Sequence, residues 1–201
     1  MATRSEQKKE QILGAATQLF FEQGYGVSMD AIADLAQVSK QTVYAHFKTK
    51  DELFETCIRA KCVANQIDGR LVDDPRPIQI VLTEFVYRFQ ALLLSDEACQ
   101  TFKAAVSQSD THPQLAQLYL NAGPRMTTEM LAQYLALKDQ QGEIKLLLPA
   151  EDAAMQLLLM AHGKVVYWAY LGQSSEETDA ERYAYLNACV EVFLRAHQCN
   201  P

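Results

Sequence analysis

The sequence predicts an all-α fold, and three observations support this prediction. No run of β-branched residues alternates with polar ones, and no Asn-Gly or Asp-Gly pair joins two such runs. Apolar residues instead recur every three or four positions, which is the spacing of one helical face. The 201 residues are 49% hydrophobic and include only 8 Gly and 6 Pro. That composition is typical of a globular chain with a packed core, and it excludes a fibre, a disordered chain and a large multidomain enzyme.

The first four helices are predicted from apolar stripes and capping residues. Gly24 is expected to end the first helix in the left-handed conformation. The Thr49-x-x-Glu52 capping box starts the fourth, because its hydroxyl and carboxylate satisfy backbone N–H groups. The expected ranges are about 5–23, 29–36, 40–46 and, for the fourth helix, about Lys50 to the Asp-Asp-Pro-Arg-Pro segment at 73–77.

The rest of the chain is expected to be helical as well, with breaks at His112-Pro113 and Gly123-Pro124. Pro149 suits the first position of a long apolar helix. Either Ser174-x-x-Glu177 or Thr178-x-x-Glu181 caps the last helix. Two long, adjacent, apolar helices at the end of a chain indicate a dimer interface. The expected ranges are 78–93, 96–108, 113–122, 124–140, 149–171 and about 179–197.

Residues 28–47 have the pattern of a helix-turn-helix. Ser39 is expected to cap the second helix of the motif. Polar side chains face outward there, where such proteins place the residues that enter the major groove of DNA. Gln41 suits adenine, whereas Tyr44 and Lys50 suit the phosphate backbone. The predicted DNA-binding residues are Ser28, Ser39, Lys40, Gln41, Thr42, Tyr44, His46, Lys48 and Lys50.

The stretch from Ile12 to Phe54 resembles the TetR/AcrR family of ligand-responsive bacterial repressors. It contains Ala-x-x-Leu-Phe, Gly-Tyr, Ser-Met-Asp, Val-Ser-Lys-x-Thr-Val-Tyr-x-His-Phe and Lys-x-Glu-Leu-Phe. Further along, Phe-Lys-Ala-Ala-Val at 102–106, His-Pro-Gln-Leu-Ala at 112–116 and Gly123-Pro124 are similar to the AefR-type ligand-binding region of that family.

The resemblance implies a subunit of about nine helices that dimerises through the last two. Residues 1–49 would be the DNA-binding domain and 50–201 the ligand-binding and dimerisation domain. The family often has Gly where this chain has Gln37 and Gln41. Gln37 is therefore expected to adopt a positive φ at a cost of about 1 kcal/mol. Gln41 adds a side chain that can contact a base.

Large side chains between the helices of the second domain are candidates for an effector pocket. Their abundance favours a small apolar or amphipathic effector, with Arg88 as the charged exception. The candidate ligand-binding residues are Phe85, Arg88, Phe89, Phe102, Met126, Met130, Tyr134 and Trp168. The candidate dimer-interface residues are Met160, Gly163, Tyr167, Leu186, Val190, Phe193 and Leu194.

Other classes of function find little support. No catalytic motif is present, so we expect no enzyme, no cofactor and no metal. The five cysteines form no C-x-x-C pair, and Cys57 and Cys62 are left open as a redox switch. No signal peptide or membrane span is evident, which predicts a cytoplasmic protein. The net charge of −7 arises after residue 50, since residues 1–50 carry six Lys or Arg against five Asp or Glu.

The sequence is therefore interpreted as a homodimeric bacterial transcriptional repressor that a small effector releases from a pseudo-palindromic operator. Three alternatives stay open: an activator of the same fold, a helical interaction protein that does not bind DNA, and a helical enzyme with a fortuitous helix-turn-helix. The effector, the operator and the target genes are not encoded in any motif.

Overall fold

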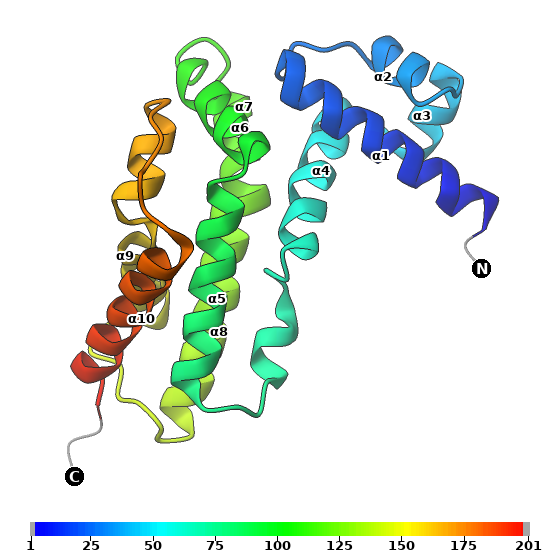
Figure 1. The fold of residues 1–201 in the computed structure, drawn as a ribbon. Helices are drawn as coiled ribbons and strands as arrows, with labels where there is room; N and C mark the ends of the chain where they lie inside the picture. Colours follow the sequence, from blue (N-terminus) through cyan, green and yellow to red (C-terminus); the bar gives the residue numbers. More distant parts are fainter. Residues whose placement is uncertain (1–2, 199–201) are drawn as a thin grey trace. The chain divides into compact units, whose positions relative to one another are not determined.

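The computed structural model describes residues 3–198, and the all-α prediction is confirmed because no strand occurs in that range (Figure 1). The π-helical turn η2 joins α7 to α8 without a break, so residues 3–198 contain nine α-helices when that pair is taken as one. The elements are α1 (Arg4–Gln23), α2 (Met29–Leu35), α3 (Lys40–His46), α4 (Lys50–Ala64), η1 (Gly69–Asp73), α5 (Ile78–Leu93), α6 (Asp96–Ser107), α7 (Pro113–Leu120), η2 (Asn121–Arg125), α8 (Met126–Gln140), α9 (Ala150–Tyr170) and α10 (Asp179–Ala196).

The described chain forms two compact units. Unit 1 comprises residues up to 61 together with 96–123, and unit 2 comprises 62–95 together with the residues from 124 onward. The chain passes between them inside α4, between α5 and α6, and inside η2.

Unit 1 is built on a core to which α1, α2, α3 and the first part of α4 all contribute. In it α1 packs against α2 and α6, α2 against α3, and α6 against α7. Phe20 and Phe54 meet edge to face with ring centroids 5.1 Å apart. The fully buried side chains of this core include Ile12, Ile32, Val43, Leu53 and Leu115.

Unit 2 is a helical bundle in which α8 packs along α9 and against η1, while α5 packs against α9 and α10. Figure 1 shows α5 and α8 as long helices of this bundle, together with α9 and α10. The apolar stripe of α5 supplies much of the core, as its spacing predicts. Buried members of this core include Leu82, Phe85, Tyr134, Leu157 and Val190.

The end of α4 differs from the prediction. The helix stops at Ala64, well before the 73–77 segment. Gln66 adopts a positive φ of 57°, and the N–H of Ile67 donates to the carbonyl of Cys62 at 2.9 Å. Gln66 therefore ends α4 with a left-handed backbone conformation, at a position where glycine is the usual residue. Asp68 then caps η1 by accepting from the N–H of Arg70.

Three smaller expectations are corrected. Gly24 has a positive φ of 72°, but its ψ of −171° is extended and not left-handed helical. The hydroxyl of Thr49 accepts from the N–H of Glu52 as expected, yet the Glu52 carboxylate binds the N–H of Lys48 instead of that of Thr49. Pro124 does not interrupt the helix, because the wider π turn accommodates the missing N–H. The last helix uses the Thr178 and Glu181 capping box, one of the two alternatives.

The helix α9 is broken at Gly163, which has φ 58° and ψ −177°. Side chains from α5 and α10 satisfy the carbonyls that this break leaves open. The amide of Gln90 donates to the carbonyls of Ala161 at 2.8 Å and His162 at 3.3 Å. The hydroxyl of Tyr185 donates to the carbonyl of Met160 at 2.9 Å. A Cβ at Gly163 would lie 2.9 Å from the Tyr185 ring. This close contact and the positive φ each require glycine at this position.

Cysteines and membrane spans give simple results for the described part of the chain. Cys57, Cys62, Cys99 and Cys189 are buried and form no disulfide with one another, and burial raises the pKa of Cys57 to about 11. Cys199 lies outside the described residues. No single helix between residues 3 and 198 is long and apolar enough to cross a membrane, although α5 and α6 pass the length and composition test when joined.

Candidate nucleic-acid interface

The helix-turn-helix is formed by α2, a short turn and α3, and each helix has its own cap. Ser28 caps α2 by accepting from the N–H of Ala31 at 3.1 Å. Ser39 caps α3 by accepting from the N–H of Thr42 at 3.1 Å, which confirms that prediction. These bonds fix where each helix begins, because the first N–H groups of a helix lack partners within it.

The turn between the two helices contains one residue with a positive φ and is closed by a backbone hydrogen bond. Gln37 has a φ of 54°, as expected from the glycine that the family often has there. The N–H of Val38 donates to the carbonyl of Ala33 at 3.0 Å, which closes the turn. Val43 and Phe47 anchor α3 in the core, so its opposite face is left to solvent.

The outward face of α3 carries the predicted base-contacting side chains. Gln41 is exposed and makes no hydrogen bond within residues 3–198, so its amide is available to a base. Tyr44 is 43% exposed. Lys40 is exposed but pairs with Asp30 of α2 at 2.8 Å, and that hydrogen bond raises the pKa of the lysine.

The remaining predicted residues of this region differ in exposure, and two of them belong to the cap of α3. The hydroxyl of Thr42 lies 2.7 Å from that of Ser39, which makes it part of the cap. His46 is half-buried at the end of α3, and the side chain of Lys48 is exposed. Thr42 and Ser39 therefore support α3 more than they extend its polar surface.

The start of α4 adds a contact that sequence reasoning missed. The ammonium of Lys50 lies 4.3 Å from the centroid of the Tyr25 ring. The hydroxyl of Tyr25 donates in turn to the carboxylate of Asp51. Burial lowers the pKa of Lys50, and burial followed by the Asp51 bond raises that of Tyr25. Tyr25 thus positions the ammonium of Lys50 at the start of α4. In the sequence, the Gly24-Tyr25 pair was the one sign of a role for Tyr25.

Two family models match this chain. The one described as "Bacterial regulatory proteins, tetR family" matches residues 12–57, which contain the helix-turn-helix and the start of α4. The one described as "AefR-like transcriptional repressor, C-terminal domain" matches residues 80–199. The chain belongs to the TetR family. It is therefore a transcriptional regulator with a DNA-binding helix-turn-helix and not an enzyme.

Individual relatives extend the likeness over the whole chain. The transcriptional repressor BepR from Brucella suis is 28% identical over 169 residues, which cover 81% of this chain and 80% of BepR. A TetR-family regulator from Mesorhizobium loti has a TM-score of 0.78 and 27% identity, covering 98% of this chain and all of the other. The flavonoid-responsive regulator FrrA has a TM-score of 0.75 and 30% identity, covering 96% of this chain and 98% of FrrA.

The candidate ligand-binding residues of this TetR-family chain are only partly brought together. Phe85, Phe89, Met130 and Tyr134 share the buried core of unit 2, and Met126 packs against it. The hydroxyl of Tyr134 has no hydrogen-bond partner in the described structure. Elsewhere, Phe102 belongs to unit 1, where its ring faces Tyr119, and Trp168 is exposed beside Tyr167. Arg88 is half-buried and lines a cleft.

The candidate interface residues also divide by burial. Leu186, Val190 and Phe193 are buried in the core of their own subunit, so they are not available to a partner. Met160, Gly163 and Leu194 are half-buried, and Tyr167 is exposed. Sequence spacing identifies an apolar stripe but does not show which of two stripes faces the core. The large exposed apolar residues of α9, its C-cap and α10 are Met155, Leu159, Tyr167, Trp168, Leu171, Tyr183, Tyr185 and Val192.

Proposed function

We propose that this TetR-family regulator is a homodimeric repressor whose α3 helices read successive major grooves of a pseudo-palindromic operator. The observation that carries the proposal is α3 itself, which is capped by Ser39, anchored by Val43 and open to solvent at Gln41 and Tyr44. The repressor named BepR and the match to a repressor C-terminal domain favour repression. Binding to chromosomal DNA places the protein in the cytoplasm.

The base-reading role of Gln41 has a direct test. Gln41→Ala is expected to reduce discrimination at one base position of each half-site by about 1–3 kcal/mol, because a bidentate pair with adenine is lost. Affinity is measured by fluorescence anisotropy on the operator, on single-base variants and on random DNA. Gln23→Ala, at the exposed end of α1, is the matched control. An equal loss on all sequences would remove Gln41 from the base-reading set.

Dimerisation is proposed through the exposed apolar faces of α9 and α10. Leu159 and Val192 are each 60% exposed, and monomeric proteins rarely leave many such residues on neighbouring helices. Leu159→Glu or Val192→Glu is expected to give monomers in sedimentation analysis. Val106→Glu, on the exposed face of α6, is the control and should stay dimeric. Variants of α9 and α10 that remain dimeric would move the interface elsewhere.

Effector control is proposed through α4, the helix that begins in unit 1 and ends in unit 2. Residues 1–49 would act as the DNA-binding domain and residues 50–201 as the ligand-binding and dimerisation domain. A small apolar or amphipathic effector bound in unit 2 would favour a conformation in which the two α3 helices have the wrong separation. The name of FrrA, a flavonoid-responsive regulator, supports control by a small molecule. By linkage, DNA must then weaken effector binding by the same factor.

Activation is the second candidate function, and one relative favours it. The activator FasR from Mycolicibacterium smegmatis is 38% identical over 65 residues, which cover 32% of this chain. Transcription from the target promoter in a deletion strain separates the two functions. Expression rises on deletion of a repressor and falls on deletion of an activator.

A further inference from the structure

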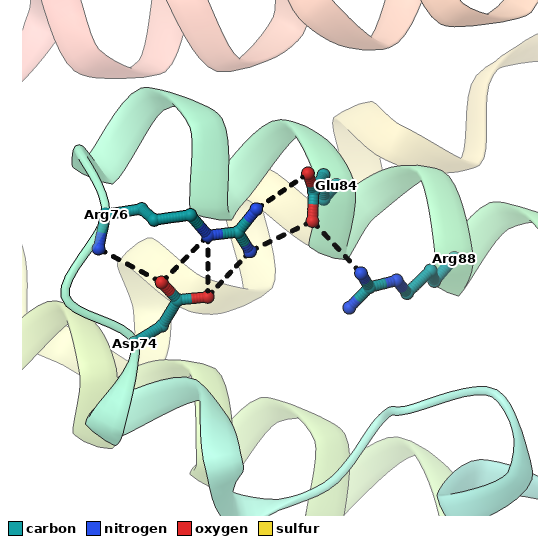
Figure 2. A network of polar contacts seen from close by, with 4 residues as sticks. All are labelled: Asp74, Arg76, Glu84 and Arg88. Carbon is teal, nitrogen blue, oxygen red and sulfur yellow. Dashed lines mark hydrogen bonds and ion pairs between the residues drawn. The ribbon is translucent and has the colours of Figure 1, made fainter.

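Unit 2 contains a polar cleft of about 200 Å³, which we call the arginine cleft. Its walls come from the segment after α4, from η1, from the turn that follows η1 and from α5, so it lies within one unit. Figure 2 shows four of its side chains. The charged residues that line it are Asp68, Arg70, Asp74, Arg76, Glu84 and Arg88.

The guanidinium of Arg76 donates hydrogen bonds to two carboxylates, those of Asp74 and Glu84. Its Nε and Nη2 donate to the carboxylate of Asp74, with the shortest distance 2.7 Å. Its Nη1 and Nη2 donate to the two oxygens of Glu84 at 2.9 and 3.0 Å. The hydrogen bonds from the side chain and backbone of Arg76 lower the pKa of Asp74 to about 2. Arg76 therefore ties the turn after η1 to α5.

Arg88 differs from Arg76, because most of its N–H groups donate no hydrogen bond within the described chain. Within the described chain its side chain makes one hydrogen bond, from Nη2 to an oxygen of Glu84 at 3.0 Å. That oxygen also accepts from Arg76, so the charge of Glu84 is shared between two guanidinium groups. Figure 2 shows the other terminal nitrogen of Arg88 pointing away from Glu84. A guanidinium carries five N–H donors in a planar fork, which leaves Arg88 able to bind a planar anion.

Three of the residues that line the arginine cleft are apolar. Val81 and Phe85 line it although each is only 2% exposed, and Leu71 is half-buried beside them. A ligand with a small apolar body and one charged end fits this combination of apolar and charged lining residues. The volume is below the about 300–1,000 Å³ usual for drug-sized ligands, so the ligand must be small.

We propose that the arginine cleft binds the carboxylate of a small organic acid, with Arg88 as the residue that recognises the anion. The inference rests on the proposed function, because it assigns the charge and size of the effector of this regulator. A cation is disfavoured, since Asp68, Asp74 and Glu84 already accept from arginines. A phosphate dianion is disfavoured as well, because those three carboxylates repel a double charge more strongly than a single one.

The position of the arginine cleft explains how a ligand bound in unit 2 would influence unit 1, which contains α3. Gln66, the left-handed residue that ends α4, is one of the lining residues. A ligand held between Arg88 and this segment fixes the end of α4 relative to α5. Because α4 begins at Lys50 in unit 1, which also contains α3, its end is a suitable point at which to control that unit.

The proposal is tested by calorimetry on the full-length protein without DNA, with benzoate and hexanoate as probes and benzamide and hexanamide as their uncharged counterparts. We expect at least one acid to bind with a Kd between micromolar and low millimolar, and its amide to bind at least about tenfold more weakly. Arg88→Gln should weaken binding of the acid at least about tenfold. Arg88→Lys should recover part of the loss, because it restores the charge without the fork. Arg195→Gln, an exposed arginine of α10, should bind like the wild type.

Several results would overturn the proposal. They are the absence of acid binding to the wild type, equal binding of acid and amide, and undiminished binding to Arg88→Gln. Anisotropy with operator DNA then tests regulation separately, since the acid should lower DNA affinity in the wild type and not in Arg88→Gln. If the acid binds without affecting DNA, the site stands and its regulatory role is rejected. If the protein binds the acid but no DNA, the proposed function fails and the site stands.

Discussion

At the residue scale, Gln37 and Gln66 hold left-handed backbone conformations that favour glycine. Gln37→Gly and Gln66→Gly are each expected to raise the free energy of unfolding by up to about 1 kcal/mol, because the clash of Cβ with the backbone is relieved. Urea denaturation measures the change. Gln133→Gly, on an exposed position of α8, is the control and should lower the same quantity by about 1 kcal/mol. An equal loss in all three variants would show that neither position is strained.

The pKa of Asp74 gives a pH prediction at this scale. Its pKa is about 2 in the folded chain, against an ordinary value of 3.8, because it accepts hydrogen bonds from Arg76. A lowered folded-state pKa stabilises the protein above the unfolded-state value, and this contribution is lost as the pH falls from about 4 towards 2. The melting temperature of Asp74→Asn should therefore fall less over that window than that of the wild type. Asp73→Asn, whose carboxylate has no ion pair among the described residues, should follow the wild type.

Only one of the two strained glutamines was predictable. Gln37 falls in a motif that often has glycine at this position, and that glycine indicates a positive φ. Gln66 lies where the sequence carries no such sign, since Gln is an ordinary helix residue and the next Pro comes only at position 75. The end of α4 is decided by the burial of Ile67 in the core of unit 2 and by the Asp68 cap, both of which depend on tertiary contacts.

At the scale of elements, the start of α4 is expected to grip the DNA backbone beside α3. Lys50→Ala should weaken binding to specific and random DNA alike and reduce the slope of log affinity against log salt by about 1, because one phosphate contact is lost. Tyr25→Leu should show a smaller loss of the same kind, since the ring that holds Lys50 is removed. Lys145→Ala, an exposed lysine of unit 2, should leave both slope and affinity unchanged. A slope unaffected by Lys50→Ala would exclude the phosphate contact.

The break in α9 depends on Gln90, which is fully buried. Its amide serves two carbonyls of α9, and its oxygen accepts from Nε of Arg182 at 3.1 Å. Gln90→Leu is expected to lower the free energy of unfolding by at least about 2 kcal/mol, because these buried polar groups lose their partners. Gln79→Leu, on the exposed face of the same helix, should change it by less than about 0.5 kcal/mol. Comparable effects in urea denaturation would show that the break is stable without Gln90.

The helices themselves follow closely from the sequence, whereas their irregularities do not. The bounds of α3 and α5 agree with the expected ranges because caps and apolar periodicity are local signals. The π turn around Pro124 and the break at Gly163 require knowledge of neighbouring helices. Sequence reasoning named Gly163 as a candidate dimer-interface residue and did not predict the ring of Tyr185 of the same chain, which lies against it.

At the scale of the whole molecule, the sequence identifies the DNA-reading motif better than the effector site. The motif is a short, continuous stretch whose residue types are tied to its geometry. A pocket is assembled from distant segments, so apolar side chains such as Phe85 and Trp168 could not be sorted into core and surface beforehand. Arg88 was recognised as a charged exception, but Arg76, which shares Glu84 with it, was not, because the turn after η1 brings Arg76 to α5.

The most direct test of the regulator is fluorescence anisotropy of the purified protein with DNA from its own upstream intergenic region, compared with random DNA over a salt series. We expect tight binding to the upstream DNA, at least about 10³-fold tighter than to random DNA, and a steep fall of affinity with salt. Equal and weak binding to both DNAs, followed by a genome-wide binding selection that recovers no preferred sequence, would contradict the proposed function.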